Sequence, residues 1–417
     1  MRGVAAACRA AAGALLACAL LGVASPSPSP SASPVPAPTT PEQSAAIALA
    51  QARLDSMLRT GHADASWFSD AFLEQVSVSK VDQVLASIAK QVGPYQSIEY
   101  TPAGFVAHFA KGTDVFLVHL DSDNKIDGLF AKPPQLSASS LDDALRGLQD
   151  LTGTLSYVII ESRFQRAALD PSEALAVGSA FKLAVLNALL DEIARGTRHW
   201  TDVVPLEGRW KSLPTGTFQN WPDGTPITVA SYAAQMISIS DNTAADALVR
   251  LTGPRALAPY AGGNDPFLTT REAFVLRSDA DGDLRAAYLA AHTPSERAAL
   301  LRRADAMPLP SVMQLGSTPV LAIEWHYSVR RLCALMERVA SLPLMSINPG
   351  VAQPGDFRHV AYKGGSDTGA INMTTMVTTH RGTKICFSAT LDNAQRDVAE
   401  DAFTLAYGTA LHQLASL

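Results

Sequence analysis

The sequence contains no long apolar run free of charge and only a modest number of basic residues. No uncharged apolar stretch reaches the roughly 18 residues that a membrane-spanning helix needs, which excludes a polytopic membrane protein. The 33 Lys and Arg residues are outnumbered by 39 Asp and Glu residues, and the net charge is −6. This balance argues against a nucleic-acid partner, because phosphate binding needs clustered cations. With 47% hydrophobic and 17% charged residues, the 417-residue chain has the composition of about two or three packed domains.

The chain also lacks the signatures of two common classes of hydrolase. It has no Gly-x-Ser-x-Gly, the turn that presents the serine of an α/β-hydrolase. None of the nine histidines stands at zinc-ligand spacing from another, which argues against a zinc amidase. His326 and His359 are therefore expected to be surface or hydrogen-bonded core residues. The sequence predicts neither a metal site nor a cofactor.

The N-terminal segments predict an exported chain. Residues 1–24 combine two early arginines with fifteen uncharged, mostly apolar residues, which is typical of a signal peptide. A lipobox-like stretch ending at Cys18 leaves a lipoprotein anchor as the alternative. Residues 25–41 hold seven Pro and five Ser, a composition typical of an extended spacer. We therefore expect a secreted, periplasmic or cell-envelope protein, with the spacer as a tether.

Cysteine is scarce in the rest of the chain. Only Cys333 and Cys386 follow the predicted leader. Two cysteines do not make a disulfide-dependent fold, although in an oxidising compartment they could pair. The alternative, two buried small side chains, remains open from the sequence.

Residues 42–133 are expected to form a small α+β domain. Helical apolar periodicity extends to Gly93, and from Tyr95 alternating apolar residues predict antiparallel strands. Lys132 and the two prolines after it break this pattern and mark a boundary. No catalytic cluster stands out in this part, so a packing or binding role is expected.

Residues 135–417 are expected to form a second, larger domain. Helices are expected at 141–151 and 394–414, and strands at 155–161, 360–363, 371–378 and 384–391. The middle of the domain is largely helical. Strands at both ends with helices between them predict one antiparallel sheet whose first and last strands meet.

A serine three residues before a lysine recurs in the sequence. Residues at this spacing are neighbours on a helix, so a serine can give its proton to a lysine whose pKa is lowered by burial. The spacing occurs at Ser77/Lys80, Ser87/Lys90, Ser122/Lys125 and Ser179/Lys182. Only the last opens a strongly apolar helix, where a buried lysine is costly unless it has a task. Ser179 at a helix N-terminus would also favour a developing oxyanion, so this pair is the expected nucleophile and base.

Two further motifs follow in the chain. Residues 240–242, Ser-Asp-Asn, stand between two expected helices, where a simple helix N-cap is the alternative interpretation. The same triplet at 122–124 is expected to be a turn. Lys363 precedes two glycines on a late strand, where exposed backbone N–H groups could bind a substrate along the strand edge. A glycine-rich hairpin is the alternative there.

In this order, Ser-x-x-Lys, Ser-Asp-Asn and Lys-Gly-Gly resemble the motifs of the penicillin-recognising serine enzymes, above all the class A β-lactamases. The segments SDNTAADALVRLTG and KGGSDTGAINMTTMV resemble that family beyond the motif letters. The resemblance covers residues 141–417. It implies a three-layer α+β or α/β domain, with an antiparallel sheet, flanking helices and an all-helical lobe.

The preceding small domain is similar to that of the clavulanate-cluster β-lactamase-like protein and related mycobacterial lipoproteins, which implies a cystatin-like or steroid-isomerase-like fold.

The resemblance implies catalytic roles for three of the motif residues. Ser179 would be the acylated nucleophile and Lys182 would accept its proton. Ser240 would relay the proton to the leaving group.

It also implies a substrate-binding set along the late strand. Asn242 would hold a substrate amide, and Lys363 would attract a substrate carboxylate. The backbone N–H groups of Ser179 and Ser366 would form the oxyanion hole, with Gly365 leaving room at the strand edge.

The sequence departs from the class A pattern at two points. The Glu-x-x-Leu-Asn loop, whose glutamate activates the deacylating water, is missing. Between Asn242 and Lys363 the candidates for this role are Glu272, Asp279, Asp281 and Asp283, and none has the surroundings of that loop. Glu272 is nearest in position, but we expect it to be a surface salt-bridge partner. Gly364 also replaces the usual Thr or Ser, which removes a hydroxyl that grips the substrate carboxylate.

These features predict an exported serine acyl hydrolase that acts on β-lactams or related amides or esters and deacylates slowly. A non-β-lactam esterase, a D-Ala peptidase of the same fold and a catalytically weak binding protein are the alternatives. The expected partner is a small molecule, and the expected state is a monomer.

Overall fold

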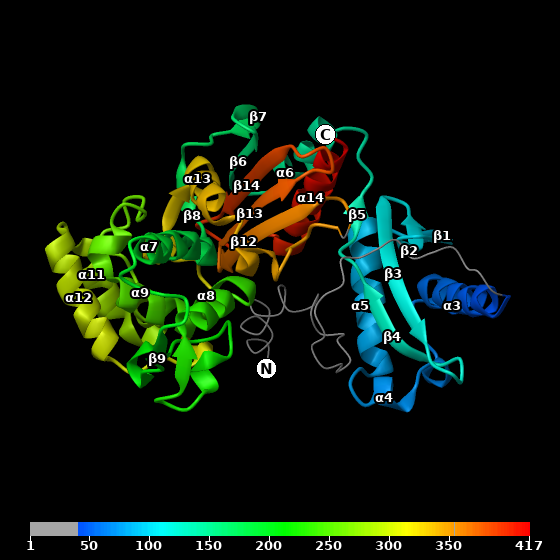
Figure 1. The fold of residues 1–417 in the computed structure, drawn as a ribbon, viewed down its shortest axis with the longest axis horizontal. Coiled ribbons are helices and arrows are strands. Elements are labelled where there is room, and N and C mark those ends of the chain that lie inside the picture. The colour runs from blue at the N-terminus through cyan, green and yellow to red at the C-terminus, as the bar shows by residue number, and fades with distance from the viewer. Residues whose placement is uncertain (1–40, 354) are drawn as a thin grey trace.

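The computed structural model describes residues 41–353 and 355–417 (Figure 1). The predicted signal peptide, the lipobox-like stretch and all of the predicted spacer except Pro41 lie outside these residues. In the part of the chain that is described, no helix is both long and apolar enough to cross a membrane.

The N-terminal region consists of helices followed by antiparallel strands, as the apolar patterning predicts. Its elements are α3 (Pro41–Thr60), α4 (Asp70–Leu73), α5 (Val78–Val92), β1 (Tyr95–Thr101), β2 (Gly104–Phe109), β3 (Gly112–Leu120) and β4 (Ile126–Ala131). The strands pair in chain order, and apolar side chains of helices and sheet form one core. Helix α5 begins after the N-cap Ser77 and ends at Gly93, whose φ of 86° favours glycine.

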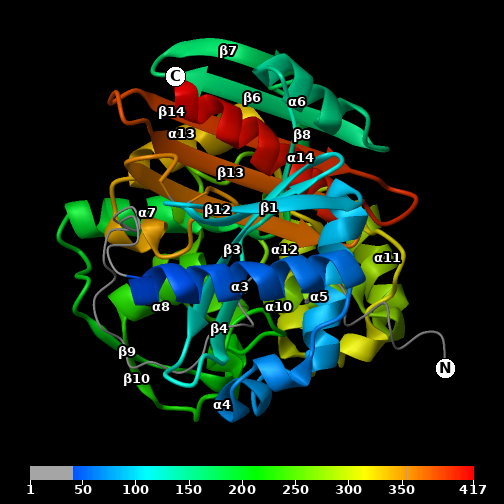
Figure 2. The ribbon, with the colours of Figure 1, turned by 90° about the vertical axis from the view of Figure 1, so that its right-hand side faces the viewer.

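The N-terminal region is joined to the rest of the chain by backbone pairing and by one helix. Strand β5 (Gln135–Leu136) pairs with β3, so the first sheet continues past the proline break. Helix α14 (Glu400–Gln413), near the C-terminus, lies beside this region (Figures 1 and 2). Leu405 of α14 belongs to the N-terminal core, and the Thr409 hydroxyl accepts a 3.0 Å hydrogen bond from the Leu136 N–H.

The larger region is built on a five-stranded antiparallel sheet. Its strands lie in the order β12 (His359–Asp367), β13 (Ala370–Thr378), β14 (Lys384–Asp392), β6 (Thr154–Glu161) and β7 (Phe164–Leu169). Pairing of β6 with β14 confirms the prediction that the first and last strands of this region meet. Strand β7 was not expected, because as an edge strand it buries little and has no clear apolar alternation.

Helices cover both faces of this sheet. Helices α6 (Leu141–Gln149) and α14 pack on one face, and α7 (Lys182–Ala194) and α13 (Val329–Val339) lie on the other. Beyond α7 lies a helical lobe, which contains α8 (Val229–Ser238), α9 (Asn242–Leu257), α10 (Thr270–Arg277), α11 (Gly282–Ala290) and α12 (Pro294–Ala306) (Figure 1). Two small sheets pair β8 (Ala174–Ala176) with β11 (His326–Ser328), and β9 (Val203–Pro205) with β10 (Pro226–Thr228). The expected sheet, flanking helices and helical lobe are therefore confirmed.

Two predicted boundaries are wrong, since the strand expected at 360–363 continues to Asp367 as β12 and the last helix starts later than expected. The last long helix begins at Glu400 and not at Ala394, because local side chains bind the backbone of the intervening turn. Asn393 Oδ1 accepts hydrogen bonds from the N–H groups of the second and third residues after it, and Asp397 Oδ1 accepts one from the N–H of Val398. Such local bonds compete with helix formation.

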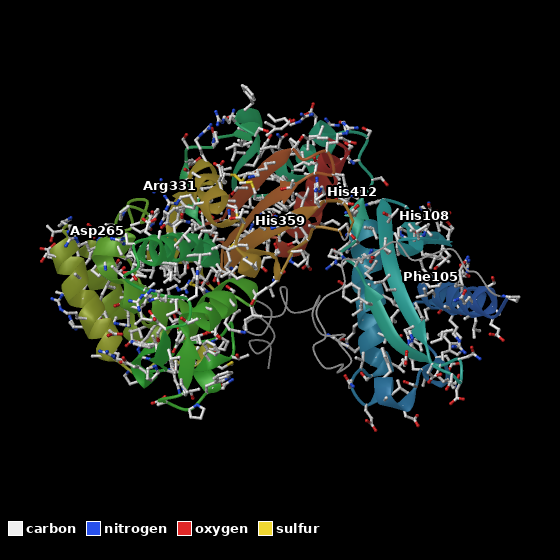
Figure 3. All side chains as sticks on the ribbon, in the orientation of Figure 1. Phe105, His108, Asp265, Arg331, His359 and His412 are labelled. Atoms are coloured by element: carbon white, nitrogen blue, oxygen red, sulfur yellow. A yellow bond between two sulfur atoms is a disulfide. The ribbon has the colours of Figure 1, made fainter. Side chains whose placement is uncertain are left out.

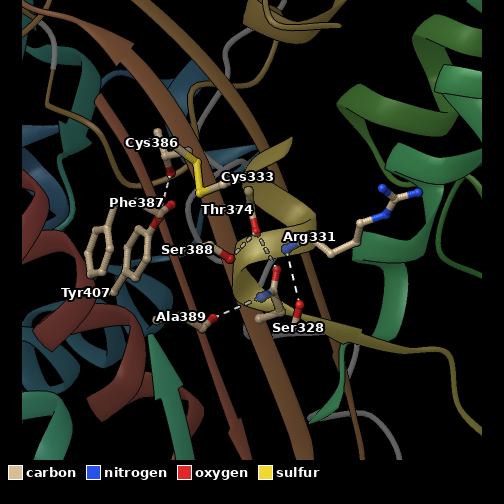
Figure 4. The surroundings of a disulfide bond; sticks show 11 residues. Ser328, Arg331, Cys333, Thr374, Cys386, Phe387, Ser388, Ala389 and Tyr407 are labelled. Carbon is tan, nitrogen blue, oxygen red and sulfur yellow. Dashed lines mark hydrogen bonds between the residues drawn. A yellow bond between two sulfur atoms is a disulfide. The ribbon is translucent and has the colours of Figure 1, made fainter. Parts of the chain in front are cut away.

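The two cysteines after the leader form a disulfide, which decides between the two alternatives left open above. The Cys333–Cys386 bond joins α13 to β14 (Figure 4). Helix α13 is held to α7 in turn, because Asn187 Nδ2 donates to the Leu335 carbonyl at 2.9 Å. The disulfide thus ties the helix that supports α7 to the central sheet.

Candidate active site

Ser179 lies on a tight turn that leads directly into α7. The turn is a 3-10 helix (Gly178–Phe181), and Gly178 has a φ of 47°. A Cβ on Gly178 would stand 2.9 Å from the backbone N of Ser366, so glycine permits the close approach of β12 as well as the backbone angle. Ser179 is half-buried, and its hydroxyl makes no hydrogen bond to any described residue. It is therefore available to a substrate.

Lys182 is the first residue of α7 and is completely buried. Its Nζ donates to the Ser240 carbonyl at 2.5 Å, to Ser240 Oγ at 3.1 Å and to Asn242 Oδ1 at 2.7 Å. The Ser-x-x-Lys and Ser-Asp-Asn motifs, far apart in the sequence, thus meet at the Lys182 side-chain nitrogen.

The Ser-Asp-Asn segment lies between α8 and α9, as expected from the sequence. Asp241 does cap α9, since its Oδ1 accepts the Ala244 N–H at 2.9 Å. Its Oδ2 also accepts the N–H groups of Thr217 and Phe218, which fixes a preceding loop. Ser240 has a φ of 58°, an uncommon conformation for a non-glycine residue. The segment is both a helix cap and part of the site, so the simple N-cap interpretation is incomplete.

Strand β12 brings the third motif to the same point. Lys363 Nζ donates to Ser240 Oγ at 3.1 Å, so one serine hydroxyl lies between two lysines. A Cβ on Gly365 would stand 2.3 Å from the Ser179 backbone N, which explains the glycine at this position. A Cβ on Gly364 would stand 2.1 Å from the hydroxyl of Tyr362, so a Thr or Ser at this position would require the tyrosine side chain to move.

Burial changes the protonation of both lysines. It lowers the pKa of Lys182 well below its usual value, and the nearby charge of Lys363 lowers it further. Burial alone lowers the pKa of Lys363 to about 7. A neutral Lys182 can accept a proton, which is the chemistry that its position one turn from Ser179 requires.

The acidic residues that could activate a water are held elsewhere. Glu272 is buried and its Oε2 accepts the Thr269 N–H at 2.7 Å in a capping box of α10, so the expected surface salt bridge is wrong. Asp279 and Asp283 are exposed and Asp281 is half-buried, and none of them bonds to a motif residue. Asp265, also exposed, lies in the helical lobe away from β12 (Figure 3).

Asp246, a buried acid one turn after Asn242, was not expected from the sequence to belong to this region. Asp246 accepts hydrogen bonds from Thr270 N at 2.6 Å, Thr270 Oγ1 at 2.9 Å and Arg271 N at 2.8 Å. Burial raises its pKa to about 7 despite these donors. It holds the start of α10 against α9, and all its bonds are to that helix start. The helical spacing from Asn242 was the signal that could have found it.

The other candidates from the sequence do not form a site. Ser77 caps α5, Ser87 lies within α5, and Ser122 lies in the turn after β3. His359, at the start of β12 (Figure 3), has its Nε2 3.0 Å from Ser346 Oγ, and His326 Nδ1 lies 3.1 Å from the Glu324 carbonyl oxygen. The two histidines thus have protein partners, as expected.

Comparison with known proteins gives a family match over part of the chain. Residues 140–303 match the model of the beta-lactamase enzyme family. The matched range includes Ser179, Lys182, Ser240 and Asn242 and ends before Lys363. No curated protein matches the chain.

Solved structures are similar to this chain at low identity. A beta-lactamase from Sphaerobacter thermophilus DSM 20745 is 19% identical, with 66% of this chain and 95% of that chain covered and a TM-score of 0.46. A beta-lactamase from Chitinophaga pinensis DSM 2588 is 17% identical, with 66% and 98% covered and a TM-score of 0.46. The structure of PBP-A is 13% identical, with 66% and 94% covered and a TM-score of 0.45.

Proposed function

We propose that this protein is a serine acyl hydrolase of the β-lactamase type, acting on β-lactams or related amides or esters through an acyl-enzyme. The proposal rests on the position of Ser240 Oγ, which lies 3.1 Å from both Lys182 Nζ and Lys363 Nζ. Lys182 in turn is one helical turn from Ser179, whose hydroxyl has no described partner. In acylation, Ser179 Oγ forms a bond to the substrate carbonyl carbon and gives its proton to Lys182. The proton passes through Ser240 to the leaving nitrogen or oxygen as the bond to that atom breaks.

The proposed oxyanion hole consists of the backbone N–H groups of Ser179 and Ser366. The close approach of Gly365 to the nucleophile turn supports it. Asn242 would hold a substrate amide, and the cationic form of Lys363 would attract a substrate carboxylate.

Deacylation is expected to be slower than acylation. Two buried acids that follow the Ser-Asp-Asn motif, Asp246 and Glu272, are bound to the backbone of α10 and its cap, and neither bonds to Ser179 or Lys182. We therefore propose that neither acid activates a water that attacks the acyl-enzyme. The predicted kinetics are a burst followed by a slow phase.

The same acylation chemistry would serve an esterase or a D-Ala peptidase, so only the substrate separates these alternatives. A binding protein without turnover is less well supported, because burying two lysines beside one hydroxyl is costly without a catalytic task.

We also propose that the protein is an exported monomer, free or tethered to the cell envelope. The disulfide supports an oxidising compartment. The N-terminal region is proposed to have the cystatin-like or steroid-isomerase-like fold of the two-domain proteins named above.

The test is the intact mass of the protein after incubation with penicillin G, beside Ser179→Ala. A persistent adduct that requires Ser179 is the expected result. If no adduct forms and penicillin is still consumed, slow deacylation is rejected. If no adduct forms and penicillin survives, an ester or peptide substrate takes its place in the same assay.

A further inference from the structure

A buried charged cluster lies at the end of β12, next to the predicted oxyanion hole. Arg277, the last residue of α10, places its Nη1 against Glu324 Oε1 at 2.5 Å and also against Asp367 Oδ2. Because both carboxyl groups contact the same nitrogen, their oxygens are close neighbours. Glu324 is 4% exposed, so this contact is shielded from water.

The cluster contains more carboxyl groups than cations. Asp392 is close enough to Glu324 to influence its charge, and each of the two has one buried oxygen without a hydrogen-bond partner among the described residues. If both Glu324 and Asp367 were ionised, Arg277 could neutralise only one of the two negative charges. Burying the second charge without a cation would raise the free energy of the folded state. A proton on Glu324 removes this charge and allows a hydrogen bond between Glu324 and Asp367. Burial accordingly raises the pKa of Glu324 to about 8, with Asp367 and Asp392 acting in the same direction.

Glu324 lies between the two halves of the predicted oxyanion hole. Asp367, its partner, directly follows Ser366 on β12. Trp325, the residue after Glu324, accepts the Val177 N–H through its carbonyl at 3.0 Å, two residues before Ser179. One bond between the Glu324 and Asp367 side chains therefore links both backbone segments.

We propose that Glu324, in its neutral form, is a positioning residue that holds the end of β12 and the nucleophile turn together. When Glu324 ionises, two anions share Arg277, the bond to Asp367 is lost and the two segments separate. The inference rests on the proposed function for the meaning of the oxyanion hole. The bracing of the two segments can be measured independently of any activity.

The groups that face Glu324 come from three elements. They are Arg277 of α10, Asp367 of β12 and Asp392 of β14, with Glu173 beyond Asp392. Burial also raises the pKa of Asp392, and an ionised Asp392 opposes the ionisation of Glu324. The change in bracing is therefore expected above about pH 8 and not in the neutral range.

The test is amide hydrogen exchange of the whole protein, read at residues 174–181 and 362–369, between about pH 7 and about pH 9.5. After correction for intrinsic exchange, wild-type protection in both segments should fall about tenfold across this range, the factor that one pKa unit represents. Glu324→Gln keeps a neutral donor for Asp367, so its protection should stay constant. The acylation rate with penicillin G is measured on the same samples.

A matched control is Glu272→Gln, which changes a second buried glutamate with a raised pKa that does not contact β12. It should keep the wild-type pH dependence. Wild-type protection that does not change with pH overturns the proposal, even if Glu324→Gln fails to fold. A variant Glu324→Gln that loses protection as the wild type does also overturns it.

The acylation arm separates this proposal from the proposed function. Loss of acylation above about pH 8 should be smaller in Glu324→Gln than in the wild type. If the protection changes appear and penicillin G never modifies Ser179 at any pH, the proposed β-lactam chemistry is rejected and the bracing by Glu324 is retained.

Discussion

The same Ser-x-x-Lys spacing occurs in the N-terminal region and in the larger region, with different outcomes. In the N-terminal region, Ser77 is exposed and caps α5, and its Oγ accepts the Lys80 backbone N–H at 3.3 Å. In the larger region, Ser179 has a free hydroxyl and Lys182 is fully buried with three polar partners. Spacing alone makes a helix cap, whereas burial of the lysine makes a candidate base.

The two helices explain this difference. Helix α5 is amphipathic and buries one face, on Val81, Leu85 and Ile88. Helix α7 is buried along most of its length, between the sheet and the helical lobe. A lysine at the start of α5 can reach water, and one at the start of α7 cannot. Desolvation, and not sequence spacing, therefore decides the chemistry.

The first test of this difference replaces the serine of each Ser-x-x-Lys pair by alanine. Ser179→Ala should reduce acylation by penicillin G at least about 10⁴-fold, because no other hydroxyl occupies the nucleophile position. Ser77→Ala should leave acylation unchanged and lower stability by about 1 kcal/mol through the lost cap. Stopped-flow acylation and thermal unfolding measure these effects. Acylation that survives in Ser179→Ala would reject the site.

The second comparison removes each lysine. Lys182→Met should lower the acylation rate about 10²- to 10⁴-fold, since the proton acceptor is lost. The fold should persist, because an apolar side chain of similar length replaces a buried amine. Lys80→Met is the matched control and should acylate at the wild-type rate. Equal rates for the two variants would show that Lys182 is not the base.

The third prediction concerns the fit of β12 against the nucleophile turn. Gly365→Ala introduces a Cβ 2.3 Å from the Ser179 backbone N, so the strand must move away. Loss of one oxyanion donor is expected to lower the acylation rate about 10²- to 10³-fold. Gly282→Ala, where the only contact of the added Cβ is Arg285 at 4.0 Å, should have no effect on acylation. A wild-type rate in Gly365→Ala would rule out the proposed oxyanion hole.

The smallest expected effect is the pH dependence caused by Lys363. Its pKa is lowered to about 7, so above that pH the site loses the cation that attracts a penicillin carboxylate. The acylation rate at low substrate concentration should fall by up to about tenfold per pH unit above 7. An uncharged activated ester should lack the part of this fall between about pH 7 and 8, because the loss above about pH 8 ascribed to Glu324 does not depend on substrate charge. A fall between pH 7 and 8 that both substrates share would assign it to another group.

The lowered pKa of Lys363 also affects stability, which should rise with pH while the acylation rate falls. Between about pH 7 and 10.5 the unfolded chain binds a proton at Lys363 that the folded protein does not, so the unfolding free energy rises with pH. Lys363→Met should remove the part of this rise that comes from Lys363, while Lys182, whose pKa is also lowered, still contributes. Denaturant unfolding of both proteins across this range measures the difference, and identical slopes would show that Lys363 is charged in the fold.

Much of the architecture was predictable because it depends on local patterning. Apolar alternation located β13 and β14 almost to the residue, and the order of strands and helices predicted that β6 and β14 would pair. Edge strand β7 and the polar turn before α14 were missed, because exposed strands and side-chain-capped turns carry little apolar signal.

By itself, the sequence determined the spacing of each motif, the chain order of the three motifs and the helix or strand that each one occupies. Only the tertiary structure decided that Lys182 is buried against Ser240, 58 residues away, that the Tyr362 hydroxyl lies where a side chain at Gly364 would stand, and that Arg277 contacts both Glu324 and Asp367. The physical reason is the sequence distance over which each kind of interaction acts. Turns, caps and apolar periodicity act between neighbours, whereas desolvation and charge depend on groups that only the complete fold brings together.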